Sequence, residues 1–464
     1  MNKKIIVSFL LVLILIISCG KKITDNPKPN QPPATYLTYY PDGDLAQTSS
    51  RQVLHWWGDD PDGKVVLFLY TWDNNATVPE TFEKSSFPGA WDTTSAYSDT
   101  FSLRFMELDT AYTFRICAVD DEGLVDRTPA EQVFPIVNTP PEVKFIVSTD
   151  IPETTFTAAS FYWTGTDLDG DDTIDRYEYV LDDTTTQWSS ISADTSFLNL
   201  KIPDELADSE HVLYLRAVDI AGVTSKIIRM PRKESSIWYV RQPLGQYLII
   251  DDYEVQDNSQ YIYQRTLDSL GVNYSVWNIK LNRNKDNAYD LMPNSVNMFT
   301  ETMLLFDRVL WYTDSNPHFE EAQIAIPKFL KVAGKKIFFS TQFREFFSEQ
   351  GDPLEFSPVD SLGKFSIDIL PGVFLEPDVN KSNFPKLKAS AWIPFVKELV
   401  PKISAQVLFR LEENPSLYSG QPVMAVANAE NTFIFFGIPF HQLNAGQNGK
   451  KFLSIIINDE FGAP

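Results

Sequence analysis

Three polar residues in the C-terminal half of the chain stand at or after the ends of short apolar segments. Their types are those needed for nucleophilic catalysis. Asp251 follows Leu248–Ile250, Ser340 follows Ile337–Phe339, and His441 comes shortly after a third apolar run. A serine becomes a nucleophile when a nearby histidine takes its proton and an acid orients that histidine. Ser340, His441 and Asp251 therefore define a candidate hydrolase site, although the Gly-x-Ser-x-Gly turn that exposes such a serine is absent around Ser340.

A second set of residues has the chemistry of a cation site. Four carboxylates crowd a short loop around a glycine: Asp167, Asp169, Asp171 and Asp172. Carboxylate oxygens are ligands that Ca²⁺ prefers, so Ca²⁺ is the one cofactor we consider. The twelfth position counted from Asp167 is Glu178, as an EF-hand requires, but the residues before it alternate like a strand rather than an exiting helix. Because Asp and Gly also form tight turns, we favour a turn without Ca²⁺.

No other motif predicts a metal or nucleotide cofactor. The remaining histidines, His55, His211 and His318, are far apart in the sequence and lack the His-Glu-x-x-His spacing of zinc enzymes. A glycine-rich phosphate loop is also missing. The chain has two cysteines, and Cys117 lies in an alternating strand pattern, so we expect it to be a small core residue.

The N-terminal residues are typical of a secretion signal, with two lysines followed by an apolar run over 5–17. The segment that ends this run, Ile-Ile-Ser-Cys at 16–19, resembles the bacterial lipobox. The resemblance implies a signal peptide over 1–18, cleavage before Cys19, and lipidation of Cys19 by diacylglycerol and usually a further acyl chain. Residues 19–36, rich in Lys, Asn and Pro, then form a tether. The protein is expected in the bacterial cell envelope, and the absence of aspartate after Cys19 favours the outer membrane.

The charge of the chain restricts its partners. The formal net charge is −23 for 464 residues, which repels nucleic acid and anionic lipid headgroups and keeps the protein soluble. The expected partners are therefore the membrane, through the N-terminal lipid, and an envelope protein or a glycan. Nucleic acid is not expected as a partner.

The sequence repeats itself over about one domain length. The segment at 56–63 reads WWGDDPDG and the segment at 162–170 reads YWTGTDLDG, while FRICAVD at 114–120 corresponds to YLRAVD at 214–219. Each copy has short alternating apolar runs bounded by turn residues, which predicts a β-sandwich. These segments resemble fibronectin type III and immunoglobulin-like modules, and the resemblance covers 37–138 and 139–236. It implies that the tryptophan of each copy lies in the core.

From about residue 237 the pattern changes to alternating strands and helices. We predict strands over 246–252, 274–277, 308–312, 337–340 and 433–437, and helices over 257–270 and 320–333. Apolar strands separated by helices are typical of a parallel sheet covered on both faces, with sites at the carboxyl ends of the strands. The predicted fold class is thus two all-β sandwich domains followed by an α/β domain, 237–464, with a mostly parallel, flavodoxin-like sheet.

The C-terminal region resembles the class I glutamine amidotransferase-like fold in the order of its elements and in the segment 330–340. In that family the nucleophile is a cysteine in a glycine-flanked turn, and a later His-Pro-Glu motif completes the site. Here Ser340 stands at the first position without flanking glycines, and of the second motif only His441 matches. The resemblance therefore implies a degenerate member without amidotransferase activity.

These observations leave three hypotheses for the function. The first is a non-catalytic envelope lipoprotein that binds or scaffolds through its β-sandwich modules and the degenerate α/β domain. The second is an envelope hydrolase that uses Ser340 and His441. The third is a carbohydrate-binding surface protein, because Trp, Tyr and Phe are plentiful and exposed aromatic rings bind sugars.

Overall fold

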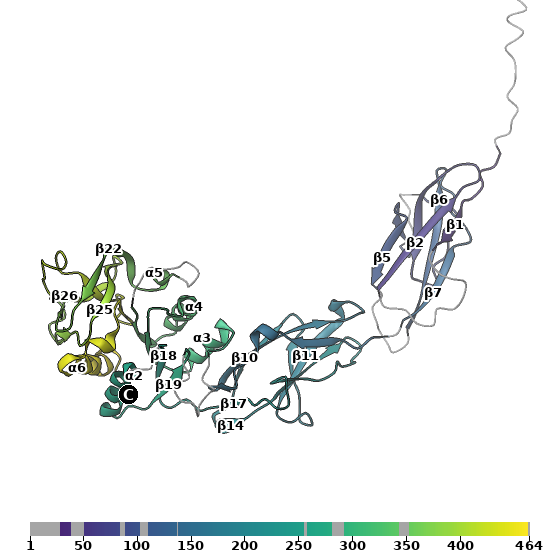
Figure 1. Ribbon diagram of the computed structural model, residues 1–464. Helices are drawn as coiled ribbons and strands as arrows, with labels where there is room; N and C mark the ends of the chain where they lie inside the picture. The colour runs from purple at the N-terminus through teal and green to yellow at the C-terminus, as the bar shows by residue number, and fades with distance from the viewer. Residues whose placement is uncertain are drawn as a thin grey trace, which may run out of the picture. The chain divides into compact units, whose positions relative to one another are not determined.

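The computed structural model describes residues 28–38, 51–83, 89–102, 110–136, 138–254, 258–280, 292–342 and 352–462 (Figure 1). The predicted signal peptide 1–18, the lipidated Cys19 and the first part of the tether lie outside the described residues. The chain divides into two compact units, one comprising residues up to 139 with 168–173 and the other comprising 140–167 with 174–464. In the part that the structure describes, no helix has both the length and the apolar character needed to cross a membrane.

The first unit contains a β-sandwich made of two antiparallel sheets. One sheet has the order β1 (Ala34–Leu37), β2 (Arg51–Asp59), β5 (Ser98–Ser102), and the other has the order β4 (Asp92–Thr94), β3 (Val65–Thr71), β6 (Thr110–Asp120), β7 (Ala130–Ile136). Trp56 of the first sheet packs across the sandwich against Phe68 and Phe114, with ring centroids 6.4 and 5.9 Å away. Trp56 and Cys117 are buried, so both are the core residues that the sequence predicts.

The second sandwich has the same three-plus-four arrangement. One sheet has the order β13 (Phe197–Lys201), β10 (Ala158–Thr166), β8 (Glu142–Phe145), and the other has the order β12 (Ser189–Ser192), β11 (Ile174–Leu181), β15 (Leu213–Asp219), β16 (Ile228–Met230). A small sheet adds β14 (Ser209–Glu210), β17 (Tyr239–Val240) and β9 (Thr154–Thr155), and single turns of helix are η1 (Val147–Thr149), η2 (Asp171–Thr173) and η3 (Asp204–Leu206). Trp163 from one sheet and Leu215 from the other lie in one core. Two tandem β-sandwiches are therefore present.

The repeated Ala-Val-Asp segment builds the same turn in both sandwiches. The Oδ1 atom of Asp120 accepts hydrogen bonds from the backbone amides two and four residues later, at 2.9 and 2.8 Å. Asp219 makes the two equivalent contacts at 2.9 and 2.8 Å. Gly123 and Gly222 sit in these turns with φ of 88° and 82°, a conformation that favours glycine. The sequence repeat thus preserves the residues that cap a strand and reverse the chain.

The C-terminal region forms a nine-stranded sheet. The strand order is β19 (Tyr274–Asn278), β18 (Tyr247–Asp252), β20 (Arg308–Thr313), β21 (Lys336–Ser340), β28 (Phe433–Phe436), β27 (Val423–Ala427), β26 (Gln406–Leu411), β23 (Phe374–Pro377), β24 (Leu387–Lys388). The first five strands are parallel and the remaining neighbours are antiparallel. The prediction of a mostly parallel sheet is therefore wrong for its second half. A parallel pair needs a long crossover, usually a helix, and the described residues from β23 to β28 contain no helix. The short helix α5 (Pro353–Phe356) precedes them.

Helices cover both faces of the parallel half. On one face lie α2 (Ser259–Leu270) and α6 (Asn448–Ile455), and on the other lie α3 (Val296–Leu304) and α4 (Phe319–Leu330). The remaining elements are a two-stranded antiparallel sheet of β22 (Val359–Ile369) and β25 (Ile393–Pro401), the short helices η5 (Phe440–Leu443) and η6 (Ala445–Gln447), and a π-helix, η7 (Ile456–Glu460). The predicted strands and helices of the parallel half are present, whereas α3 was not predicted.

The second sandwich and the α/β region each contribute a side chain to the hydrophobic core of the other. Phe156 of the sandwich lies in the core of the α/β region, with its ring 6.3 Å from Trp277 and 5.2 Å from Phe306. Met298 of α3 lies conversely in the sandwich core. The sandwich also reaches beyond the expected boundary at 236, because β17 at Tyr239–Val240 pairs with β9 and β14. These contacts join the two folds into one continuous packed unit.

Candidate functional site

The hydroxyl of the predicted nucleophile Ser340 both donates and accepts a hydrogen bond within the protein. Its side chain is completely buried at the end of β21. The hydroxyl donates to the carbonyl of Ile438 at 3.1 Å and accepts from the amide of Phe440 at 2.9 Å. Ser340 therefore fixes the loop after β28 to the sheet instead of presenting a reactive oxygen.

The other two members of the predicted hydrolase site, Asp251 and His441, contact aromatic side chains. Asp251 is buried on the same face of the sheet and, after burial itself, is a further cause of the raised pKa of Tyr263. His441 packs edge-on against Tyr253, with ring centroids 5.1 Å apart. The hydroxyl of Ser340 forms its hydrogen bonds with the backbone of Ile438 and Phe440. These contacts do not support the hydrolase site, which stays a prediction.

A polar cluster that the sequence did not predict lies on the opposite face of the same strand end. The carboxylate of Asp252 is completely buried and accepts hydrogen bonds from the backbone amide and the Nδ1 atom of His318, at 2.9 and 2.6 Å. It also accepts from the indole of Trp311 at 3.3 Å. The Nζ atom of Lys280 lies 3.7 Å from the Oδ1 atom of Asp252 and 2.7 Å from the Oδ1 atom of Asp314. The buried charge is thus paired on several sides.

The electrostatics of this cluster favour a protonated histidine. Burial lowers the pKa of His318, but the hydrogen bond and the negative charge of Asp252 outweigh it, so the pKa lies above its ordinary value. A histidine oriented by a carboxylate is one half of an acid–base relay. Among the residues described, however, no hydroxyl or thiol is hydrogen-bonded to His318. The pair instead anchors the start of α4 to β18. The sequence signal was a histidine directly before a predicted helix, and its partner, Asp252, lies 66 residues away.

The acidic loop around Gly170 adopts a turn. The Oδ2 atom of Asp169 accepts hydrogen bonds from the amide and the hydroxyl of Thr139, at 2.6 and 2.8 Å. Asp171 begins the helical turn η2, and Gly170 has a φ of 118°, which favours glycine. Within the described segments, no group of three or more acidic, histidine or cysteine side chains is arranged to hold a metal ion. Ca²⁺ binding by Asp167, Asp169 and Asp171 stays a prediction.

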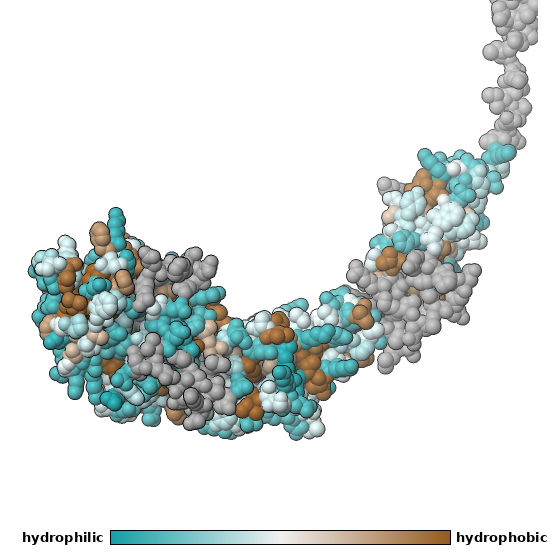
Figure 2. Space-filling view, viewed as in Figure 1, coloured by the Kyte–Doolittle hydropathy of each residue, from teal (hydrophilic) through white to brown (hydrophobic). Residues whose placement is uncertain are grey.

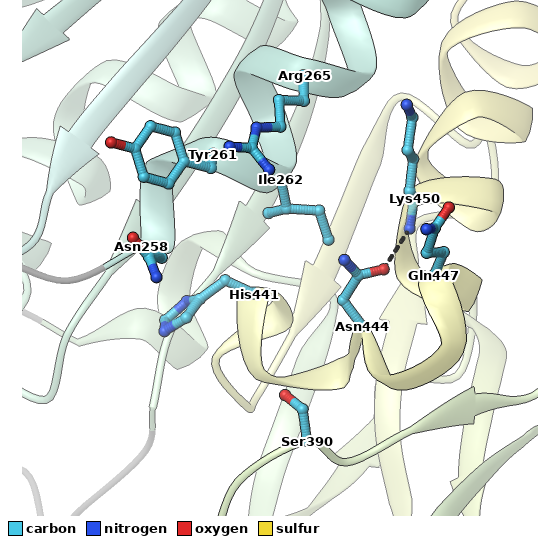
Figure 3. Close-up of a pocket in the computed structure, with 9 residues that line it drawn as sticks. All are labelled: Asn258, Tyr261, Ile262, Arg265, Ser390, His441, Asn444, Gln447 and Lys450. Atoms are coloured by element: carbon cyan, nitrogen blue, oxygen red, sulfur yellow. Dashed lines mark hydrogen bonds between the residues drawn. The ribbon is translucent and has the colours of Figure 1, made fainter.

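A pocket with a volume of about 460 Å³ opens between α2 and the segment η5–α6 (Figure 3). One wall consists of four residues along α2 and its start, the other wall of residues from η5 to α6, and a serine completes it. The lining residues are Asn258, Tyr261, Ile262, Arg265, Ser390, His441, Asn444, Gln447 and Lys450. Only His441 of this set was singled out from the sequence. The others come from three separate segments, 258–265, Ser390 and 444–450, which only the folded chain brings together.

Local backbone geometry shapes the wall opposite α2. Gly446 and Gln447 have φ of 72° and 60°, both in the left-handed region, and they turn the chain from η6 into α6. The side chain of Asn444 accepts a hydrogen bond from the amide of Lys450 at 3.0 Å, which holds the first turn of α6 against the loop. Figure 3 shows this contact at one side of the pocket. The wall is therefore a defined structure rather than an arbitrary surface depression.

Among the described residues, some aromatic side chains are exposed at the surface. On the first sandwich Tyr36 and Trp57 are 44% and 45% exposed and stack on each other, with ring centroids 4.3 Å apart. On the α/β region Trp392 is 56% exposed. The face of the molecule seen in Figure 2 is mainly hydrophilic, with hydrophobic residues in scattered groups.

Comparisons with known proteins found similarity to β-sandwich modules. No family model and no curated protein matches the chain. Fibronectin(III)-like modules of Clostridium thermocellum CbhA are 15% identical, with 45% of this chain and 95% of that chain covered and a TM-score of 0.19. The FN1–FN3 domains of chicken CNTN1 are 12% identical, with 48% and 70% covered and a TM-score of 0.20. Carbohydrate-binding modules of the β-sandwich superfamily are 9% identical, with 39% and 88% covered and a TM-score of 0.18. The assignment of two sandwiches rests on their own sheets and cores.

Proposed function

We propose that this chain is a lipid-anchored protein of the bacterial cell envelope that binds or scaffolds without catalysing a reaction. Two fibronectin type III-like sandwiches would carry the α/β domain, and the lipid on Cys19 would hold the molecule on a membrane, which we place at the outer membrane. The acidic net charge of −23 argues against nucleic acid as a partner. An envelope protein or a glycan is the expected ligand class.

The α/β domain is proposed to be a degenerate relative of the flavodoxin-like and amidotransferase-like folds. Numbered by appearance along the chain, the five parallel strands have the order 2-1-3-4-5, which is the flavodoxin-like order. The antiparallel strands from β27 to β24 extend that sheet at one edge. Ser340 ends the fourth parallel strand, where the resemblance places the nucleophile.

The observation that carries the non-catalytic proposal is that Ser340 and Asp252, at the carboxyl ends of the parallel strands, are buried and hydrogen-bonded. Ser340 is buried with both its donor and its acceptor capacity used by the backbone of the loop after β28. On the other face, the carboxylate of Asp252 accepts hydrogen bonds from His318 and Trp311. A catalytic serine needs an exposed oxygen, and the buried, backbone-bound hydroxyl of Ser340 does not offer one.

Labelling with a fluorophosphonate probe tests the absence of a reactive serine. The full-length protein in detergent should remain unlabelled under conditions that label a known serine hydrolase. The Ser340→Ala protein should also lose about 1–3 kcal/mol of unfolding free energy, because buried backbone groups lose their partner. Ser235→Ala, at an exposed serine, is the matched control. Labelling that disappears in Ser340→Ala, but not in Ser235→Ala, would overturn the non-catalytic proposal in favour of the hydrolase.

Metabolic labelling with an alkyne fatty acid tests the anchor. Wild-type protein should incorporate the label and partition into membranes, whereas Cys19→Ala should do neither. Cys117→Ala is the control, because Cys117 is buried and burial raises the pKa of its thiol to about 12, which leaves it protonated and inert. Equal labelling of wild type and Cys19→Ala, or a mature protein that retains Met1, would contradict the anchor.

A carbohydrate-binding role has one specific observation in its favour, the exposed stacked pair Tyr36–Trp57. Exposed aromatic faces offer a platform for the apolar face of a sugar ring. On a glycan array, binding through this pair should disappear in Trp57→Ala and persist in Trp392→Ala, which removes an exposed tryptophan of the other unit. Binding that survives Trp57→Ala would exclude the pair as the carbohydrate site.

A further inference from the structure

Residues of α2 line one side of the pocket, and residues from η5 to α6 line the other. Asn258, Tyr261, Ile262 and Arg265 are spaced as neighbours on one side of α2, so a continuous stripe of that helix lines the cavity. Figure 3 shows Arg265 and Lys450 on different elements at the pocket, with His441 and Ser390 nearer its other end. A volume of about 460 Å³ is in the range of small-ligand sites.

The charge of the pocket is opposite to that of the chain as a whole. Its lining contains two cations, Arg265 and Lys450, and no carboxylate. Among the residues that the structure describes, neither cation is in an ion pair, and the guanidinium of Arg265 lies over the ring of Tyr261 at 4.9 Å. Two such cations at one cavity attract an anion locally, against the net charge of −23 of the whole chain. Arginine in particular suits carboxylate and phosphate groups, because its planar fork donates two parallel hydrogen bonds.

Most of the remaining lining residues carry polar side chains without a formal charge. Three amide side chains, from Asn258, Asn444 and Gln447, come from both walls and are able to donate and accept hydrogen bonds. Ile262 is the one aliphatic residue among those that line the pocket. A purely apolar ligand would leave these polar groups without water or partners, at a cost in free energy. The ligand that fits this lining is small, carries hydroxyl groups and has a negative charge.

We propose that this pocket binds an anionic saccharide of one or two rings, with its carboxylate or phosphate held by Arg265 and Lys450. Amide side chains from the two walls contact the sugar hydroxyls, and Tyr261 offers a ring beside the charged group. The inference rests on the proposed binding function of the α/β domain and adds a ligand class to it. It does not depend on the lipid anchor.

Isothermal titration calorimetry with the full-length protein in detergent tests this inference. The probes are D-glucuronate, D-galacturonate and glucose 6-phosphate, with glucose and inorganic phosphate as comparison ligands. At least one anionic sugar should bind more tightly than both comparison ligands. Arg265→Gln and Lys450→Gln should each weaken that binding by about tenfold or more, because a hydrogen bond to a charged group is lost.

Lys451→Gln is the matched control, since it removes the same charge from the neighbouring residue of α6, which is exposed and does not line the pocket. Its affinity for the anionic sugar should equal that of wild type. Equal loss in Lys451→Gln and Lys450→Gln, affinity for glucose as high as for the acids, or tightest binding to inorganic phosphate would each overturn the inference. If no anionic sugar binds while the protein stays lipidated and unreactive to fluorophosphonate, the ligand class fails and the proposed function stands.

Discussion

Polar residues at the strand ends differ in role because their side chains point to opposite faces of the sheet. Asp251 and Asp252 are adjacent, yet Asp251 lies near Tyr263 on the α2 face and Asp252 contacts His318 on the α4 face. Successive side chains of a strand alternate in this way. The sequence identified both acids as strand-end residues, but it did not identify their partners. Those partners decide that the contacts are structural.

The pair formed by Asp252 and His318 predicts a pH dependence of stability. The folded state raises the pKa of His318, so its stabilising contribution is complete below the ordinary histidine pKa and is lost as the pH rises through the raised value. Urea unfolding of wild type and His318→Gln should therefore differ most near pH 6, and the difference in unfolding free energy should shrink toward pH 9. A difference that stays constant over this range would contradict the assigned protonation.

At the scale of elements, the repeated aspartate turn is the clearest case in which local sequence specifies local structure. Asp120→Ala and Asp219→Ala each remove a carboxylate that accepts two backbone amides, so each should lower the unfolding free energy by about 1–3 kcal/mol. Asp194→Ala, at an exposed aspartate of the second sandwich, is the control and should change it by less than about 0.5 kcal/mol. Thermal unfolding of the three variants measures this, and equal effects would show that the turn hydrogen bonds contribute little.

The helix α3 shows why one element escaped prediction. Its apolar residues face two different cores: Met298 points into the second sandwich, whereas Phe299 and Met303 point into the α/β sheet. A helix with two buried sides lacks the single apolar stripe by which an amphipathic helix is recognised. The sequence also does not predict the strands β22 to β27, which pair antiparallel with one another and with β28.

At the scale of the whole molecule, the shared core predicts that the second sandwich and the α/β region unfold together. Phe156→Ala should leave a cavity beside Trp277 and Phe306 and cost about 3–5 kcal/mol. Hydrogen exchange should then accelerate in β10 and β18 alike. Phe197→Ala, which truncates a largely exposed ring of the same sandwich, should leave β18 unchanged. Exchange that accelerates in β10 alone would contradict a common unfolding unit.

The sequence by itself determined the two β-sandwiches and the parallel strands of the C-terminal sheet. These features follow from short-range patterns of apolar and turn residues, which are set within about ten positions. Only the tertiary structure decided that Ser340 is buried under the loop after β28, that Asp252 pairs with His318, and that residues from three segments line a positively charged pocket. The physical reason is that a site depends on which side chains of distant segments meet, and no local pattern records that.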